Sequence, residues 1–242
     1  MHISEATGDV APRPAPAAGE RELKFVLRAG RADILRRRLD SLCRRDPKYP
    51  SARVWTIYYD TPALVSLGEK LNSDYLKRKI RVRWYSDLAG RASGPAFIEA
   101  KLRIGNRRSK IRARLPYPAD DMATWDLQDA RLRDLPMLLR QHGVLDQEPW
   151  QPVMLIRYRR DRFVDRLTHT RVSLDAEISA VSMNPRYAPR IDPSPLAAAV
   201  LEVKGASEEL PATLRPLLPL GIRKSSFSKL HMLYAHVTRQ VI

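Results

Sequence analysis

Acidic and basic side chains recur at every second position in six segments of this 242-residue chain. Successive side chains of a strand point to opposite faces, so each segment is predicted to be a strand with one charged face and one apolar face. Arg and Lys bind phosphate oxygens, whereas a carboxylate near phosphate has a use as a ligand of a divalent cation. The charged sets are Glu22 and Lys24; Lys79, Arg81 and Arg83; Glu99, Lys101 and Arg103; Lys110, Arg112 and Arg114; Arg171, Ser173, Asp175 and Glu177; and Glu202 and Lys204.

A solvated face of an antiparallel sheet is the simpler interpretation of any one of these strands. Taken together, the six segments mix Arg with Glu and carry few of the Thr, Ser and Gln residues that are usual on a solvated face. The net charge of +16 also predicts a polyanionic partner. Arg, Lys, Glu and a metal ion in one channel would supply the charge neutralisation and positioning that phosphoryl transfer needs.

The hydrophobic pattern predicts an α+β domain of antiparallel strands with helices packed outside. If the helices cover the apolar face, the charged face lies inside, and closing the sheet into a barrel would make a hydrated tunnel. Residues 1–19, rich in Pro and Ala, are expected to form a disordered or extended arm, and residues 20–242 one domain. The predicted strands are 21–27, 53–60, 78–85, 95–103, 109–115, 154–163, 171–178 and 199–204, and the predicted helices are 31–44, 120–142, 208–218 and 226–240.

Composition excludes several classes of protein. The lone Cys43 allows neither an intrachain disulfide nor a cysteine-based zinc site, and it favours a reducing, cytoplasmic compartment. No apolar run is long enough to span a membrane, and no Gly-rich P-loop is present. Aromatic residues make up only 7%, too few for extensive base stacking, so nucleic acid is an unlikely partner.

An ordered set of short motifs resembles the polyphosphate polymerase domain of the vacuolar transporter chaperone family, within the triphosphate tunnel metalloenzymes. Each motif is weak alone, and their order across about residues 20–236 gives the resemblance its specificity. The motifs are Arg21 to Phe25 (RELKF), Tyr58 to Pro62 (YYDTP), Arg78 to Tyr85 (RKIRVRWY), Phe97 to Lys101 (FIEAK), Tyr158 to Phe163 (YRRDRF), Arg171 to Asp175 (RVSLD), Leu201 to Lys204 (LEVK) and Ser226 to Lys229 (SFSK).

The resemblance implies an eight-stranded antiparallel tunnel that transfers the γ-phosphate of ATP onto polyphosphate with Mn²⁺ or Mg²⁺. One departure is Ser226, where the family often has Lys. By motif position, the residues expected to act on the transferred phosphate are Lys24, Arg81, Arg83, Lys101, Arg160, Arg171 and Lys229; further phosphate contacts are expected from Lys79, Lys110, Arg112, Lys204 and Ser228; and Glu202, with Glu99 and Glu22 as weaker candidates, is expected to hold the metal.

Two other functions stay open on the sequence. Sibling families with the same tunnel hydrolyse triphosphates and carry a Glu-x-Glu-x-Lys signature, which Glu20, Glu22 and Lys24 reproduce here. A non-catalytic polyphosphate-binding module is the third alternative. The expected ligands are ATP, pyrophosphate and polyphosphate. Relatives act in membrane complexes, so any action at a membrane is expected to be peripheral or to need a separate membrane protein.

Overall fold

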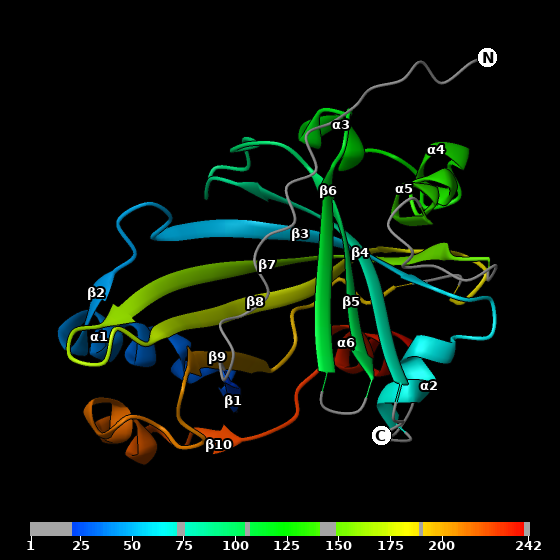
Figure 1. The fold of residues 1–242 in the computed structure, drawn as a ribbon. Coiled ribbons are helices and arrows are strands. Elements are labelled where there is room, and N and C mark those ends of the chain that lie inside the picture. Colours follow the sequence, from blue (N-terminus) through cyan, green and yellow to red (C-terminus); the bar gives the residue numbers. More distant parts are fainter. Residues whose placement is uncertain (1–20, 72–75, 105–106, 141–148, 189–190, 240–242) are drawn as a thin grey trace.

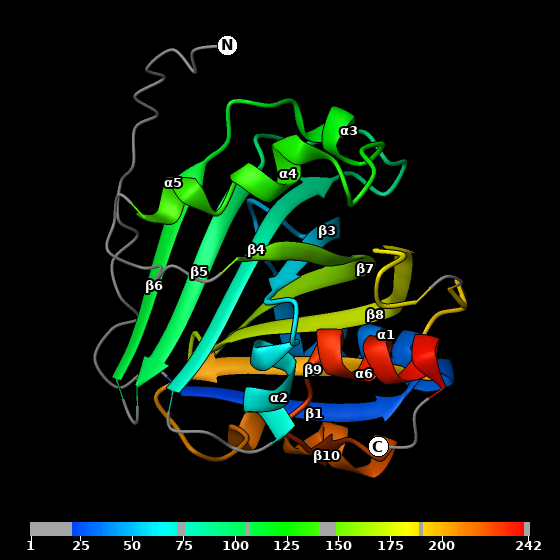
Figure 2. The ribbon, with the colours of Figure 1, turned by 90° about the vertical axis from the view of Figure 1, so that its right-hand side faces the viewer.

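The computed structural model describes residues 21–71, 76–104, 107–140, 149–188 and 191–239, so the predicted arm at 1–19 lies outside the described residues. Within them, ten strands form one antiparallel sheet in the order β10-β1-β9-β8-β7-β3-β4-β5-β6, with β2 paired to β7 (Figures 1 and 2). The strands are β1 (Arg21–Arg28), β2 (Cys43–Arg45), β3 (Ser51–Asp60), β4 (Leu76–Ser86), β5 (Phe97–Ile104), β6 (Arg107–Arg114), β7 (Gln151–Asp165), β8 (Arg171–Met183), β9 (Ala198–Gly205) and β10 (Arg223–Lys224).

All eight predicted strands are present, as β1 and β3 to β9, and the α+β class is confirmed. The prediction of a closed barrel is wrong, because the described sheet is open between β6 and β10. The sheet nevertheless curls strongly, with β4 to β6 turned across β1, β8 and β9 (Figure 2). This curl brings Lys101 of β5 within electrostatic reach of Glu22 on β1 and Lys204 on β9.

Helices cover the outer, apolar face of the sheet in two groups. α1 (Ala32–Leu42) and η2 (Ala212–Leu220) pack on β1, β8 and β9 through Leu35, Leu39 and Leu214. α3 (Ala119–Met122), α4 (Ala130–Asp134) and α5 (Met137–Arg140) pack on β3 to β6. The structure therefore divides the single helix predicted at 120–142 into three short ones. No helix of the described residues is long and apolar enough to cross a bilayer.

Other helix boundaries differ from the predictions. The helix predicted at 31–44 ends at Leu42, and Cys43 begins β2 instead, after the short η1 (Ala29–Arg31) and α1. The segment predicted as helix 208–218 is the 3₁₀ helix η2, which contains Pro216 and Pro219. Proline lacks the amide hydrogen that an α-helix interior needs, which explains the 3₁₀ form.

The inward face of the sheet has an apolar half and a charged half. In the apolar half, Met154, Ile178 and Val200 pack against α6 (Lys229–Thr238) and α2 (Val65–Leu71). A register shift between β7 and β8 and the left-handed backbone of Glu177 (φ 54°) mark the boundary. Glu177 is exposed, so its predicted place beside Asp175 on the charged face is wrong. The irregularity moves Ile178 inward instead.

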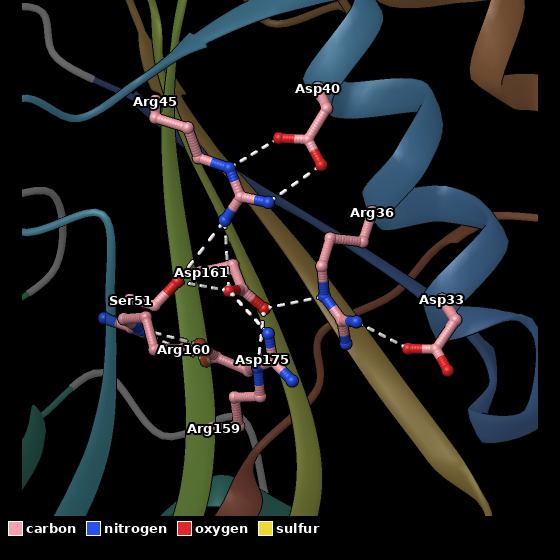
Figure 3. A network of polar contacts seen from close by, with 9 residues as sticks. All are labelled: Asp33, Arg36, Asp40, Arg45, Ser51, Arg159, Arg160, Asp161 and Asp175. Atoms are coloured by element: carbon pink, nitrogen blue, oxygen red, sulfur yellow. Dashed lines mark hydrogen bonds and ion pairs between the residues drawn. The ribbon is translucent and has the colours of Figure 1, made fainter. Parts of the chain in front are cut away.

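A buried carboxylate on the outer face fixes α1 and β2 to β7 (Figure 3). Asp161 is fully buried and accepts hydrogen bonds from Arg36 of α1, Arg45 of β2 and Ser51 of β3, at 3.0, 3.2 and 2.6 Å. Its neighbour in the strand, Arg160, points to the opposite, inward face, where it meets Asp175 (Figure 3). This network therefore holds the segment of β7 that carries Arg160.

Packing of α6 against the apolar half predicts a large loss of stability when its central leucine is shortened. Leu233 is fully buried. Leu233→Ala is expected to lower the free energy of unfolding by about 2–5 kcal/mol, measured by urea denaturation. Met137→Ala, at a position 52% exposed on α5, should change it by less than about 0.5 kcal/mol. Equal effects of the two substitutions would contradict this packing.

Candidate functional site

Two carboxylates and two cationic side chains form a buried cluster where α6 meets the charged half of the interior. Arg160 of β7 contacts both oxygens of Asp175 at 2.6 Å and one oxygen of Glu202 at 3.0 Å. Lys229, the first residue of α6, lies 2.6 Å from Asp175 and 3.4 Å from Glu202. The structure thus brings together three residues that the sequence singled out and adds Asp175, which was predicted on the charged face without a role.

The charges in this cluster hold one another ionised. Burial would raise the pKa of the Glu202 carboxyl, but Lys229 and Arg160 bring it well below its usual range. Burial would lower the pKa of Lys229, and Asp175 and Glu202 raise it. The desolvation cost of a buried ion pair cancels much of its Coulomb energy, so such pairs add little to the stability of the fold. Their position inside a curled sheet suggests that they hold cations ready for an anion.

A second cluster surrounds Glu99 on β5. Arg81 donates to one Glu99 oxygen at 2.6 Å, and Lys110 lies 2.7 Å from the other, with Arg112 at 3.6 Å. Burial would raise the pKa of Glu99, and Arg81, Arg83 and Lys110 lower it. The guanidinium of Arg112 also lies 3.4 Å from the centre of the Phe97 ring. Glu99 is therefore saturated by cationic partners.

Glu22 is at the centre of a third, more exposed group. Lys24 lies 3.4 Å from one of its oxygens, and Lys204 of β9 lies 3.6 Å from the other. The Lys24 ammonium also donates to the carbonyl of Phe227 at 3.3 Å, just before α6. The charge of Glu202 acts on Glu22, so these two carboxylates approach each other across β1 and β9.

Arg83 differs from these cations because it is buried without an ion pair to any described carboxylate, although the charge of Glu99 acts on it from a greater distance. It is 7% exposed, and its Nε donates to the Thr56 hydroxyl at 3.2 Å. The groups that act on it are the side chains of Tyr58, Tyr85 and Tyr158, together with the Glu99 carboxylate. The Tyr158 hydroxyl is itself buried, and no described residue forms a hydrogen bond with it. A buried cation and an unsatisfied hydroxyl are both costly without a ligand, which makes this the strongest candidate anion site.

The sequence prediction missed the tyrosines. Arg83, Arg160 and Arg162 lower the pKa of Tyr85 to about 8, although burial alone would raise it. The ring of Tyr158 lies 4.8 Å from the Lys229 ammonium and 5.5 Å from the Arg160 guanidinium. The sequence did contain a signal for them: Tyr85 lies two positions from Arg83, and Tyr158 lies two positions from Arg160. Residues two apart in a strand share a face.

Lys101 also lies on the inward face without an ion pair among the described residues. Repulsion from Arg81, together with burial, lowers the pKa of its ammonium to about 7. The remaining predicted residues lie at the margins. Lys79 and Ser228 line a narrow pocket with Tyr58 and Leu230 beside α6, and Arg171 is exposed at the start of β8.

The carboxylates fit a metal that arrives with phosphate rather than a metal held by protein ligands alone. No three His, Cys, Asp or Glu residues of the described chain are close enough to form a metal cage. Mg²⁺ in phosphoryl-transfer sites is commonly bound by one or two carboxylates plus the substrate phosphates. Glu202 and Glu22 offer such a pair, whereas Glu99 lies in a separate cluster.

A comparison with protein families now adds to this geometry. Residues 20–238 match the family described as the VTC domain. The chain belongs to this family. The resemblance drawn from the sequence motifs is therefore confirmed over nearly the whole chain. No curated protein matches the sequence.

One solved structure supports the fold of this VTC domain. A protein from Bacillus halodurans, described as a candidate adenylate cyclase, is 12% identical with a TM-score of 0.51, covering 87% of this chain and 95% of its own. One from Vibrio parahaemolyticus with the same description is 12% identical with a TM-score of 0.38, covering 91% and 90%. At this identity the first likeness speaks for the fold alone, and the second is too weak to support an argument.

The pKa of Lys101 predicts that anion affinity of this VTC domain falls as pH rises. Below pH 7 the ammonium is charged and attracts phosphate; above pH 7 it becomes neutral. Affinity for tripolyphosphate should drop about tenfold between pH 6 and pH 8.5 relative to Lys101→Arg, whose guanidinium stays charged throughout. Isothermal titration calorimetry measures both affinities at each pH. The change in ligand ionisation with pH affects the two proteins equally and therefore cancels in the ratio of their affinities. Parallel pH profiles would contradict the assignment.

Proposed function

We propose that this VTC domain is a metal-dependent polyphosphate polymerase, which transfers the γ-phosphate of ATP onto a polyphosphate chain. The observation that carries the proposal is Arg83, a buried guanidinium without a carboxylate partner among the described residues, beside the unsatisfied Tyr158 hydroxyl. A phosphoryl group bound there would satisfy both. Phosphoryl transfer needs mainly positioning and charge neutralisation, which is what such a site supplies.

The ion-paired cations extend this binding site in two directions. Arg81, two residues before Arg83 on β4, and Arg160 with Lys229 near α6 hold carboxylates that phosphate oxygens could replace. An Arg can exchange a carboxylate for a phosphate without losing its bidentate geometry. A triphosphate would thus span from the Arg83 site toward both clusters.

Glu202 and Glu22 are the residues that would hold the divalent ion of the ATP complex. When bound, a Mn²⁺ or Mg²⁺ ion neutralises phosphate charge and polarises the transferring phosphoryl group. The carboxylates themselves contribute fixed negative charge next to Lys229, Lys24 and Lys204. That charge has no use in simple anion binding, which supports a metal-dependent reaction.

Chain extension is favoured over hydrolysis because the inward carboxylates are poor bases. Glu22, Glu99, Asp175 and Glu202 all contact cations that lower their pKa values, against the effect of burial. A carboxylate of that kind does not readily take a proton from water. A phosphate acceptor is already anionic and needs no such base.

Hydrolysis of triphosphate is the second candidate, and Lys101 is the observation that favours it. With a pKa of about 7, its amine is the described inward group that could accept a proton from water near neutral pH. Incubation of the full chain with ATP and Mn²⁺, followed by gel electrophoresis of the products, separates the two. Polyphosphate chains would support the polymerase, and free phosphate alone would support the hydrolase.

Cytoplasmic ATP and a polyphosphate or pyrophosphate primer are the proposed substrates. A reducing compartment agrees with a chain whose single Cys43 is a buried free thiol. A non-catalytic binding module would bind the same ligands without turnover in this assay.

Arg83→Met should stabilise the fold and weaken the binding of phosphate. Removing an unpaired buried charge is expected to raise the free energy of unfolding by about 1–3 kcal/mol, because desolvation of the guanidinium is no longer required. Affinity for tripolyphosphate should fall roughly 10- to 100-fold with the loss of a charge-assisted contact. Arg53→Met, on the outer face of β3, serves as the control in calorimetry and thermal unfolding. Unchanged affinity in Arg83→Met would contradict the site.

Glu202→Gln should keep the fold and lose metal-dependent turnover. The substitution removes negative charge beside Lys229 and Arg160, so affinity for metal-free polyphosphate is expected to stay equal or rise. Turnover of ATP with Mn²⁺ should fall by at least about 100-fold if the carboxylate holds the ion, since one well-placed electrostatic group is worth that much. Near wild-type turnover would leave Glu202 as an ion-pair partner only.

A further inference from the structure

Three elements that meet at one end of the molecule carry exposed leucine or isoleucine side chains. They are α1, the turn between β7 and β8, and η2, drawn in orange at the lower left of Figure 1. Ile34 of α1 is 43% exposed, Leu167 of the turn 77% and Leu218 of η2 48%. We call this region, with the cations described next, the α1–η2 end.

Contacts between these elements make the end one continuous surface. Arg31, just before α1, donates to the carbonyl of Leu220 at the end of η2 at 2.9 Å. Thr213 of η2 donates to Asp165 at the end of β7, and Arg166 of the turn donates to the carbonyl of Cys43 in β2 at 3.3 Å. The exposed apolar side chains therefore sit on a rigid frame.

The surface is cationic because both acidic residues of α1 form ion pairs with arginines in the network of Figure 3. Asp33 pairs with Arg36 at 2.6 Å, and Asp40 pairs with Arg45 at 2.5 Å. Arg37 and Arg38 share the exposed face of the helix with Ile34, following the 3-4 spacing, and neither has an ion pair among the described residues. Arg44 of β2 is also exposed.

We propose that the α1–η2 end docks this protein on an anionic lipid bilayer. Single exposed leucines are ordinary, but three on adjoining elements together with unpaired arginines match the pattern of a peripheral membrane surface. The arginines attract anionic headgroups, and the apolar side chains enter the boundary between headgroups and acyl chains. The site lies on the outer face and does not depend on the chemistry proposed for the interior.

Sedimentation of the full chain with lipid vesicles tests this proposal. We expect binding to vesicles of phosphatidylcholine mixed with phosphatidylglycerol and little binding to phosphatidylcholine alone. Leu167→Ser combined with Leu218→Ser should weaken binding roughly tenfold, with no change of net charge. Met137→Ser, at an exposed apolar position on α5, is the control and should bind as wild type.

A matched pair of charge variants separates a defined surface from general attraction to a basic protein. Arg37→Ala with Arg38→Ala should weaken binding on the order of 30-fold. Arg133→Ala with Arg140→Ala removes the same charge from exposed positions of α4 and α5 and should have little effect. Circular dichroism and ATP turnover should be unchanged in all four variants.

Several results would overturn the proposal. Equal losses in the α1–η2 variants and their controls would mean that only net charge matters. A dimer in sedimentation velocity that the serine pair dissociates would identify a second copy of the chain as the occupant. Duplex DNA binding that depends on Arg37 and Arg38, without vesicle binding, would identify nucleic acid instead.

Discussion

The cost of placing charged groups inside a curled sheet determines most of this structure. The inward face carries many more cations than carboxylates, and each carboxylate is shared between two or more cations. Desolvation of those groups is offset only where the geometry is good, as in the 2.6 Å contacts of Arg160 with Asp175. Arg83 has no such ion pair among the described residues, and in the proposed function a phosphate takes that place. We therefore infer that the interior is arranged to bind an anion supplied from outside the protein.

The rest of the fold keeps those side chains in place. Arg160 and Asp161 are neighbours on β7 but face opposite sides, so the strand is held from both (Figure 3). On the outer side Asp161 connects β7 to α1, β2 and β3; on the inner side Asp175 and Glu202 connect it to α6 through Lys229. The apolar half of the interior, closed by α6, removes water from one side of the clusters. Lower local dielectric strengthens every remaining charge interaction.

The sequence was enough to predict the strands and most of the charged face, because period-two alternation of Arg, Lys and Glu with Ile, Val and Leu is unambiguous. It failed where the backbone departs from that period. Glu177 was placed inward by strict alternation, and the irregularity in β8 turned it to solvent. Closure of the sheet was also beyond reach, since it depends on whether two strands remote in sequence, β6 and β10, pair with each other, and alternation within a strand carries no information on that. Asp175 was visible on its strand, but its role rests on Lys229, 54 positions later by sequence number.

The internal carboxylates have a consequence for which anions the proposed site would accept. A phosphate that binds at Arg83 need displace no carboxylate, whereas one that binds the cations of Glu99, Asp175 or Glu202 replaces a carboxylate there and restores only part of the energy removed. A single phosphate gains Arg83 and displaces one carboxylate at most. A chain of linked phosphates displaces several, and after its first contact the later ones are intramolecular, with a high effective concentration. Because the later contacts of a bound chain do not repeat the entropy cost of association, the proposed site would favour long polyphosphate over a single phosphate, even though each displaced carboxylate subtracts from the gain.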